Sequence, residues 1–185
     1  MSYMGDRSWW DARFKARAQS PMRHEQRLEA DISLLKPEGR VLELACGDGR
    51  NALYLARLGF TVYAVDFSEE ALRRLRRFAK DEGLDISSRL VNLAEDDFSD
   101  LGASFDAIII NHYRLPKPQY EKIPALLKPE GILWVNGFAA LPADNPNVTE
   151  NGLLRDEDLE FLRSISPIEK ELYHDGLFVR YIWSK

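Results

Sequence analysis

The sequence is poor in the residues that covalent or metal-held folds use. Among 185 residues there are only three histidines and one cysteine, Cys46. A single thiol excludes an intrachain disulfide, and the cysteine and histidines are too scattered for a structural zinc site. No apolar run is long enough to cross a bilayer, and no basic segment precedes an apolar one as in a signal peptide. We therefore expect a cytoplasmic protein with no bound metal and no membrane partner.

The chain also lacks an excess of positive charge. Its formal net charge is −5, which disfavours nucleic acid as an obligate partner because phosphate binding needs a basic surface. Hydrophobic residues make up 45% of the sequence, enough for a substantial core. The length fits a single domain, and we expect a helical or lid segment at 1–38 and a ligand-binding core at 39–185. Nothing in the sequence indicates an oligomeric state.

What the sequence does contain is a regular alternation of strand and helix patterns. Five strand patterns are each separated by turns or helical segments, and a hairpin signal, Asp175-Gly176, lies between two alternating runs near the C-terminus. This order predicts an α/β, Rossmann-like three-layer sandwich, with a mostly parallel seven-stranded sheet and an antiparallel C-terminal hairpin. Expected strands are 41–45, 61–65, 87–93, 105–111, 132–136, 168–173 and 177–183; expected helices are 8–18, 22–35, 51–58, 71–80, 119–127 and 156–164.

The segment VLELACGDGRNA, residues 41–52, is the most informative part of the chain. A strand runs into a glycine turn that opens a helix, so the backbone can approach a ligand closely and a helix N-terminus faces it. In a parallel sheet of this kind, ligands bind at the carboxyl ends of the strands. The residues expected at those ends are 45–49, Asp66, 92–93, 111–114 and 136–138.

The same segment also matches a dinucleotide-binding pattern. Gly47-x-Gly49-x-x-Ala52, followed by Asp66, keeps open an NAD(P)-dependent oxidoreductase. Tyr113-x-x-x-Lys117 would suit such an enzyme only on one helix face, and the intervening proline disfavours that helix.

Several motifs together resemble the class I S-adenosylmethionine-dependent methyltransferases, most closely the small tellurite-resistance-type subgroup. The resemblance covers residues 39 to the C-terminus and rests on the glycine turn, VYAVDFS at 62–68, FDAII at 105–109, LLKPEGIL at 126–133 and LRDEDLEFL at 154–162. It implies methyl transfer from S-adenosylmethionine to a small-molecule acceptor by direct in-line displacement, with S-adenosylhomocysteine as product. A noncatalytic cofactor-binding module is a third interpretation, since some members of such folds lose activity.

The resemblance also implies roles for individual residues. Glu43 would reach the methionine amino group, Asp66 the two ribose hydroxyls, and Asn111 the methionine side near the sulfur. Phe67, Asn92 and Leu93 would surround the adenine. Two positions depart from the family pattern: Ala45 replaces a glycine, and Asn92 replaces an acid. The full expected cofactor site is Glu43, Ala45, Cys46, Gly47, Gly49, Asn51, Asp66, Phe67, Asn92, Leu93 and Asn111.

The acceptor side of the site is less defined by sequence. His112 and Tyr113 are the candidate catalytic bases because they follow the fourth strand. Trp10, Arg13 and Arg114 are the candidate substrate residues, with the arginines suited to an anionic acceptor. The aromatic residues near Trp10 are compatible either with core packing or with a lid.

Three further features have simple structural interpretations. Cys46 is expected to be a small turn residue rather than a nucleophile. The basic run at 73–77 is expected to be a solvated helix face, and His174 is expected at the surface.

Overall fold

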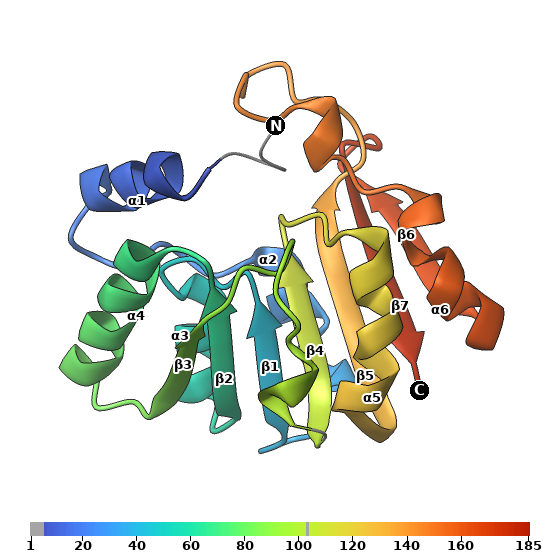
Figure 1. Ribbon diagram of the computed structural model, residues 1–185, viewed down its shortest axis with the longest axis horizontal. Helices are drawn as coiled ribbons and strands as arrows, with labels where there is room; N and C mark the ends of the chain where they lie inside the picture. The colour runs from blue at the N-terminus through green and yellow to red at the C-terminus, as the bar shows by residue number, and fades with distance from the viewer. Residues whose placement is uncertain (1–5, 103) are drawn as a thin grey trace.

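The computed structural model describes residues 6–102 and 104–185, and these form a seven-stranded sheet between two layers of helices (Figure 1). The strands are β1 (Arg40–Leu44), β2 (Thr61–Asp66), β3 (Ile86–Leu90), β4 (Phe105–Asn111), β5 (Leu127–Phe138), β6 (Ile168–Tyr173) and β7 (Phe178–Ser184). Their spatial order is β3-β2-β1-β4-β5-β7-β6. The predicted α/β, Rossmann-like class is therefore confirmed.

Strand direction follows the prediction as well. β1 to β5 pair in parallel, whereas β7 runs antiparallel between β5 and β6. The chain moves outward from β1 to β3 on one side, and then returns to place β4 on the other side of β1. This reversal creates the crevice at the carboxyl ends of β1 and β4 where ligands bind in such sheets.

The centre of the sheet is buried on both faces. In β4, Ile108 and Ile110 belong to one apolar cluster, and Ala107 and Ile109 belong to the cluster on the opposite face. An uninterrupted apolar run is what a strand covered by helices on both sides requires. The segment 105–111 was predicted as such a strand, and its bounds agree.

Helices cover the two faces in separate groups. Side chains from α2, α3 and α4 join one cluster, while those from α5 and α6 join the other. The helices are α1 (Arg7–Ala16), α2 (Gln26–Ala30), α3 (Arg50–Arg57), α4 (Glu69–Asp81), α5 (Ile123–Leu126) and α6 (Glu160–Ile165). Short 3₁₀ segments are η1 (Ile32–Leu34), η2 (Ser99–Leu101), η3 (Lys117–Lys122), η4 (Glu150–Gly152) and η5 (Asp156–Leu159).

Two helices are shorter than their sequence patterns predicted. The expected helix at 22–35 reduces to α2 and η1, because Glu25 has extended backbone and donates its N–H to Asn51 Oδ1 at 2.9 Å. The expected helix at 119–127 divides into η3 and α5 where Pro124 enters, since proline lacks the N–H that a continuing helix needs. The predicted third strand ends early, at Leu90, because the backbone turns at Asn92.

The sequence signals for a helix cap and a hairpin turn agree with the structure better than the predicted lengths of the helices do. Ser68 caps α4, its Oγ accepting the Ala71 N–H at 3.1 Å. Asp175 and Gly176 both have positive φ, and Leu177 N–H donates to His174 O at 3.0 Å, as in a tight hairpin turn. No helix within the described ranges combines the length and the apolar character needed to cross a bilayer.

Candidate functional site

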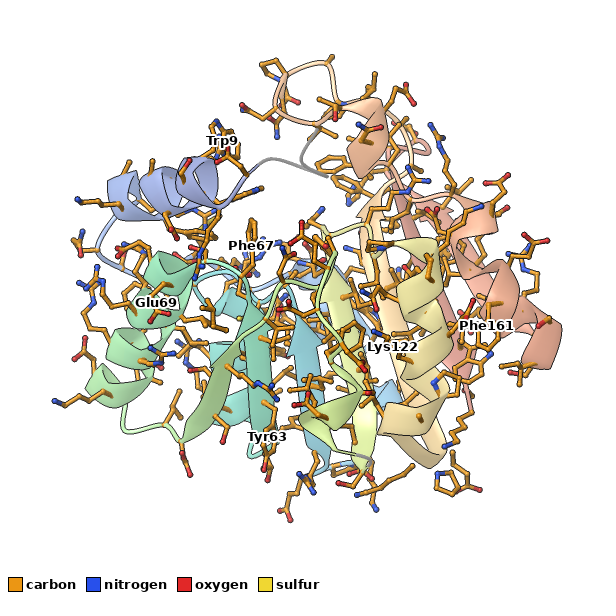
Figure 2. All side chains as sticks on the ribbon, viewed as in Figure 1. Trp9, Tyr63, Phe67, Glu69, Lys122 and Phe161 are labelled. Atoms are coloured by element: carbon orange, nitrogen blue, oxygen red, sulfur yellow. The ribbon has the colours of Figure 1, made fainter. Side chains whose placement is uncertain are left out.

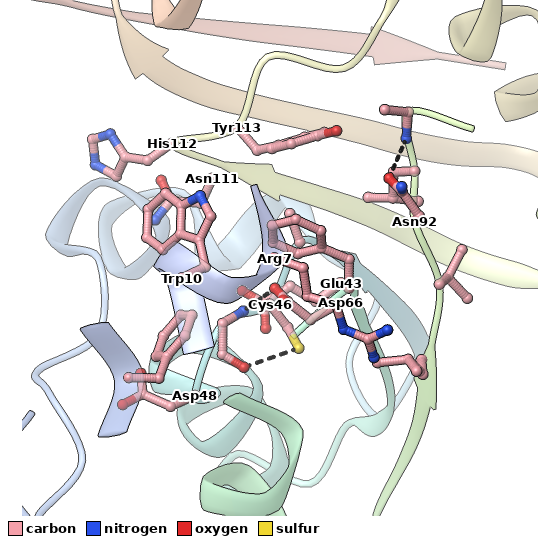
Figure 3. A pocket seen from close by; sticks show the side chains of 18 of the residues that line it. Arg7, Trp10, Glu43, Cys46, Asp48, Asp66, Asn92, Asn111, His112 and Tyr113 are labelled. Atoms are coloured by element: carbon pink, nitrogen blue, oxygen red, sulfur yellow. Dashed lines mark hydrogen bonds between the residues drawn. The ribbon is translucent and has the colours of Figure 1, made fainter. Parts of the chain in front are cut away.

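A cavity of about 1050 Å³ opens at the carboxyl ends of β1, β2 and β4 (Figure 3). It is as large as the upper end of the usual range for small-molecule sites. Most residues predicted for the cofactor line it, and so do both candidate bases. The predicted residues that line it are Glu43, Ala45, Cys46, Gly47, Asn51, Asp66, Phe67, Asn92, Leu93, Asn111, His112, Tyr113 and Trp10.

Gly49 is the exception among the predicted cofactor residues. It lies at the start of α3 with a φ of 87°, and it is absent from the cavity wall. A Cβ on Gly49 would come within 2.2 Å of Leu75 Cδ1. Close packing of α3 against α4 is therefore enough to explain the glycine, and its predicted contact with the cofactor stays a prediction.

Glu43 is a buried carboxyl group in the middle of the cavity floor. Its side chain points from β1 and is 2% exposed. Oε1 accepts a hydrogen bond from Asn51 Nδ2 at 3.0 Å, whereas Oε2 has no partner in the described part of the chain. Burial raises the pKa of Glu43 to about 7. A buried carboxyl oxygen without a donor is costly, so the site is suited to a ligand that brings a hydrogen-bond donor or a positive charge.

Asp66 fastens the end of β2 to the glycine turn. Its Oδ2 accepts the Gly47 N–H at 2.8 Å, and its Oδ1 accepts the Ser68 N–H at 2.9 Å. Burial raises the pKa of Asp66 to about 6 despite these hydrogen bonds. A carboxylate offers about four lone-pair positions, so each oxygen can accept a further hydrogen bond from a ligand hydroxyl.

The glycine turn brings the backbone to the cavity wall. Ala45 has a φ of 56°, a left-handed conformation that costs energy for a residue with a Cβ. Cys46 is buried, and burial raises the pKa of its thiol well above the usual value. This agrees with its interpretation as a turn residue, because a nucleophilic cysteine needs a lowered pKa.

One end of the cavity is formed by Phe67 and the loop after β3. Asn92 is already engaged there, since its Oδ1 accepts the Ala94 N–H at 3.1 Å and its N–H donates to Asp96 Oδ2 at 2.7 Å. The Asn92 side chain therefore shapes the loop. Ala94 and Glu95 line the cavity beside it.

The opposite end is formed by the residues that follow β4. Asn111 Oδ1 accepts a hydrogen bond from Asn136 Nδ2 at 3.0 Å, which fixes its orientation. His112 Nε2 lies 3.1 Å from Glu25 Oε2. Burial acts to raise the pKa of Glu25, but the hydrogen bond and charge of His112, with Arg50 nearby, lower it to about 2. Sequence reasoning missed Glu25, because no local pattern links it to a residue 87 positions away.

Helix α1 covers the glycine turn and divides its aromatic residues among three environments. Phe14 is buried against Gly47, where a Cβ would lie 3.2 Å from Phe14 Cζ. Trp10 lines the cavity, and Trp9 is exposed on the outer side of the helix (Figures 2 and 3). Core packing and covering of the site are thus both present, in different residues.

Two of the three predicted substrate residues lie outside the cavity wall. The Arg13 guanidinium stacks over the Trp9 ring at 4.7 Å, and Arg13 does not line the cavity. Arg114 pairs with the buried Asp158 through two hydrogen bonds of 2.8 and 2.7 Å and does not line it either. The predicted anionic-substrate role of these two arginines therefore stays a prediction, since neither residue lines the cavity in this conformation.

A buried ionic cluster attaches α1 to α4. Asp48 Oδ1 pairs with Arg17 Nη1 at 2.9 Å, and Asp48 Oδ2 pairs with Arg74 Nε at 3.1 Å. Arg74 also donates to Ala18 O at 2.6 Å. The basic run at 73–77 was predicted to be a solvated helix face, and Arg74 departs from that prediction because it is only 1% exposed. Its position three residues after the buried Ala71 was the signal that could have identified it.

The residues proposed for hydride-transfer chemistry are not on one helix. Tyr113 follows β4 in an irregular segment, and Lys117 begins η3. The pattern expected of a short-chain dehydrogenase is therefore absent from this segment.

Comparison with known proteins finds a matching domain model and several relatives of this chain. Residues 41–131 match the family model described as a methyltransferase domain. The chain is 32% identical over 142 residues to a ubiquinone biosynthesis O-methyltransferase of Xanthomonas axonopodis pv. citri, covering 73% of this chain and 58% of that protein. It is 34% identical over 143 residues to the protein of the same name in Caulobacter sp. strain K31, covering 69% and 56%. The chain thus spans little more than half the length of these relatives.

Solved structures share the fold over nearly the whole chain. A SAM-dependent methyltransferase from Aquifex aeolicus superposes with a TM-score of 0.70 at 16% identity, covering 94% of this chain and 97% of that one. TehB from Haemophilus influenzae superposes with a TM-score of 0.65 at 18% identity, covering 95% and 67%. At these identities the likeness concerns the fold alone. The strand order and these superpositions show the fold that SAM-dependent methyltransferases have, and residues 41–131 of this chain match a methyltransferase domain.

Proposed function

We propose that this protein transfers the methyl group of S-adenosylmethionine to a small-molecule acceptor and releases S-adenosylhomocysteine. The proposal rests on one observation: Oε2 of buried Glu43 has no partner among residues 6–102 and 104–185, and Glu43 and Asp66 line the same cavity. An ammonium group is the ligand group that best satisfies a buried carboxylate, and a vicinal diol suits a second carboxylate.

The residues at the cavity wall fit the rest of the cofactor. Glu43 would hold the methionine amino group, and the free lone pairs of Asp66 would accept the ribose hydroxyls. Phe67, Asn92 and Leu93 would enclose the adenine, and Asn111 would face the methionine side. The N–H of Gly47 is already donated to Asp66, so the proposed role of the turn is to allow close approach.

The cofactor supplies an electrophilic methyl carbon on a sulfonium. The chain's own contribution is to orient an acceptor in line with that carbon and to exclude water. Well-oriented placement supplies on the order of 7–11 kcal/mol. We assign the exclusion of water to Trp10 and Phe14 of α1, which line the cavity. In this proposal 39–185 is the cofactor-binding core, and the described part of 1–38 covers it.

The acceptor class is proposed from the cavity and from the relatives. A cavity of about 1050 Å³ that also lodges the cofactor leaves room for a small molecule. The matched relatives carry the name O-methyltransferase, so a hydroxyl oxygen is the first acceptor to test. Thiols, amines and oxyanions complete the panel.

Calorimetric titration with S-adenosylhomocysteine tests the proposal. We expect saturable binding to the unaltered protein, at least tenfold weaker binding to Glu43→Gln and Asp66→Asn, and no response to NADH or NADPH. Glu29→Gln is the matched control, because Glu29 lies on α2 and does not line the cavity. Binding of NADPH without binding of S-adenosylhomocysteine would refute the proposal. Transfer of labelled methyl to the panel then separates an enzyme from a noncatalytic module.

A further inference from the structure

A hydrogen-bond relay of three side chains, Tyr173, Asn136 and Asn111, leads from the C-terminal hairpin to the cavity wall. Tyr173, at the end of β6, donates its hydroxyl proton to Asn136 Oδ1 at 2.6 Å. Asn136 Nδ2 in turn donates to Asn111 Oδ1 at 3.0 Å. Asn111 is the last residue of β4 and lines the cavity (Figure 3).

The sheet holds the two asparagines next to each other. Asn111 and Asn136 are paired in the parallel register of β4 and β5, so their side chains emerge on the same face of the sheet. The Asn136 carbonyl oxygen also accepts the N–H of His112 at 2.7 Å, which holds the backbone just beyond the end of β4. Asn136 is 0% exposed, so water does not replace either of its side-chain partners.

Tyr173 is held at the outer end of the relay by contacts on its ring. The ring stacks on Phe178 with centroids 5.4 Å apart, and the Arg27 guanidinium lies 5.5 Å from the Tyr173 centroid. Burial raises the pKa of Tyr173 to about 12, and the charge of Glu25 acts in the same direction. The hydroxyl therefore keeps its proton across the neutral range and enters the relay as a donor.

The direction of the relay decides which atom of Asn111 faces the cavity. Because the Asn136 oxygen accepts from Tyr173, its NH₂ group faces Asn111, and the Asn111 oxygen points back toward Asn136. Asn111 Nδ2 has no hydrogen-bond partner among the residues that the structure describes. It is also not one of their fully buried unpartnered atoms, so it keeps accessible surface where Asn111 lines the cavity. Asn111 therefore offers N–H donors to a ligand.

An N–H donor at this position distinguishes between classes of acceptor atom. An ionised oxygen has several lone pairs, so one can attack the methyl carbon while another accepts a hydrogen bond. A neutral amine nitrogen has a single lone pair, which the attack uses, and its own N–H groups would need an oxygen to accept them. Sulfur is a weak hydrogen-bond acceptor. The relay thus favours an oxyanion over an amine or a thiol.

We propose that the methyl acceptor is a small molecule with an ionised oxygen, a phenolate or a carboxylate, which accepts a hydrogen bond from Asn111 Nδ2, and that Asn136 and Tyr173 are positioning residues that keep the amide in this orientation. The inference rests on the proposed methyltransferase function and names its acceptor class. The oxygen forms its bond to the methyl carbon while the bond from that carbon to sulfur breaks, and the electron pair of that bond stays on sulfur. The negative charge of the oxygen and the positive charge of the sulfur are both lost, so the step balances without a proton transfer.

Four variants change the relay or serve as its control. Asn111→Asp keeps an oxygen that accepts from Asn136 and replaces the NH₂ group by a second oxygen. Asn136→Asp removes the donor to Asn111, so the Asn111 amide should turn and present its oxygen to the cavity. Tyr173→Phe removes only a hydroxyl, and it keeps the test decisive if Asn136→Asp does not fold. Tyr181→Phe is the matched control, because the Tyr181 hydroxyl donates to Asp156 at 2.8 Å and neither residue lines this cavity.

Nitrogen-15 spectra of the side-chain amides report the orientation without any acceptor. The Asn111 signals are assigned by their loss in Asn111→Asp. They should shift in Tyr173→Phe and stay unchanged in Tyr181→Phe. Calorimetry should give an S-adenosylhomocysteine Kd within threefold of the unaltered protein for all four variants, because the relay serves the acceptor and not the cofactor.

Methyl transfer at saturating cofactor tests the acceptor class. The probes are 4-nitrophenol and benzoate as oxyanions, with aniline and thiophenol as an amine and a thiol of similar size. The unaltered protein should methylate the oxyanions in preference to the other two. In Asn111→Asp and Asn136→Asp, kcat/KM for the oxyanions should fall about 10–100-fold, as expected for loss of a hydrogen bond to a charged group. In Tyr173→Phe it should fall about 2–10-fold, and in Tyr181→Phe it should not change.

Four results would overturn the proposal. Unchanged Asn111 signals in Tyr173→Phe would show that the relay does not set the amide. S-adenosylhomocysteine binding more than threefold weaker in Asn111→Asp would assign the N–H groups to the cofactor. Preferred methylation of aniline or thiophenol, or undiminished oxyanion turnover in Asn111→Asp, would exclude the acceptor class. Failure of the proposed function is distinct, because it would appear as no S-adenosylhomocysteine binding by the unaltered protein.

Discussion

The substitution Asp48→Ala tests how α1 is held over the cavity. It removes the carboxylate that lies between Arg17 and Arg74, at 2.9 and 3.1 Å. The two arms of this cluster differ in exposure, since the Arg17 side chain is 30% exposed and that of Arg74 only 1%. Asp48 itself is nearly inaccessible, so its loss leaves a buried guanidinium whose remaining hydrogen-bond acceptor in the described part of the chain is Ala18 O.

The expected loss of stability follows from the difference between the two arms. An ion pair that reaches solvent contributes about 0–1 kcal/mol, so Arg17→Ala should cost little. Removing one partner of a buried pair costs about 3–5 kcal/mol, because the remaining charge is uncompensated. Asp48→Ala should therefore lower the free energy of unfolding by about 3–5 kcal/mol. At about 2–4 °C per kcal/mol for a chain of this size, Tm should fall by roughly 6–20 °C.

Urea unfolding of four proteins measures this prediction. The unaltered chain, Arg17→Ala, Asp48→Ala and the double variant Asp48→Ala with Arg74→Met are compared at one pH and ionic strength. The double variant removes the orphaned charge and keeps most of the side-chain volume, so it should recover stability relative to Asp48→Ala. The reasoning is refuted if Asp48→Ala costs no more than Arg17→Ala, or if adding Arg74→Met destabilises the protein further.

Three other substitutions probe the cavity floor and the glycine turn. Because burial raises the Glu43 pKa from 4.5 to about 7, the folded protein binds more protons than the unfolded chain between those pH values, and stability should fall as pH rises through that window. Glu43→Gln should flatten this dependence in thermal unfolding scans from pH 5 to 8, and stabilise the protein at pH 8 by on the order of 1–3 kcal/mol. Ala45→Gly should relieve about 1–2 kcal/mol of strain from the left-handed backbone of Ala45. The added conformational freedom of glycine in the unfolded chain should offset about 0.4–1 kcal/mol of that gain. A small rise in Tm is therefore expected, and a clear fall would contradict this reasoning. Gly49→Ala should cost about 1–3 kcal/mol or more in urea unfolding, because its Cβ would lie 2.2 Å from Leu75 Cδ1 at a φ of 87°; an unchanged midpoint would contradict the packing role.

Local sequence signals predicted the fold because each one determines the conformation of the short segment in which it lies. The apolar run of β4, the Ser68 cap and the Asp175-Gly176 turn need only neighbouring residues to take effect. Boundaries were wrong where a distant contact or a proline competed with the local pattern. Pro124 divides one helix, and Glu25 leaves the expected helix at 22–35 to bond with Asn51.

In the candidate site, the residues at strand ends were predictable from the sequence, whereas the partners of charged residues were not. Glu43 and Asp66 lie at or near strand ends, so the topology alone brings them to one edge of the sheet. Arg114 and Arg13 were proposed from charge, but a charge in sequence does not specify whether a partner neutralises it. In the folded chain Arg114 forms an ion pair with Asp158, and Arg114 does not line the cavity.

Glu25 connects the segment before the sheet to two residues of the cavity wall, Asn51 and His112. Its backbone N–H reaches Glu43 through Asn51, and its carboxylate reaches His112, so one residue contacts the hydrogen-bond network at both ends of the cavity. Glu43 lies on β1 and His112 follows β4, and among the described residues Glu25 links the two side chains by hydrogen bonds. The relative orientation of Glu43 and His112 thus depends on how the N-terminal segment docks, and the Asp48 cluster fixes α1 of that same segment.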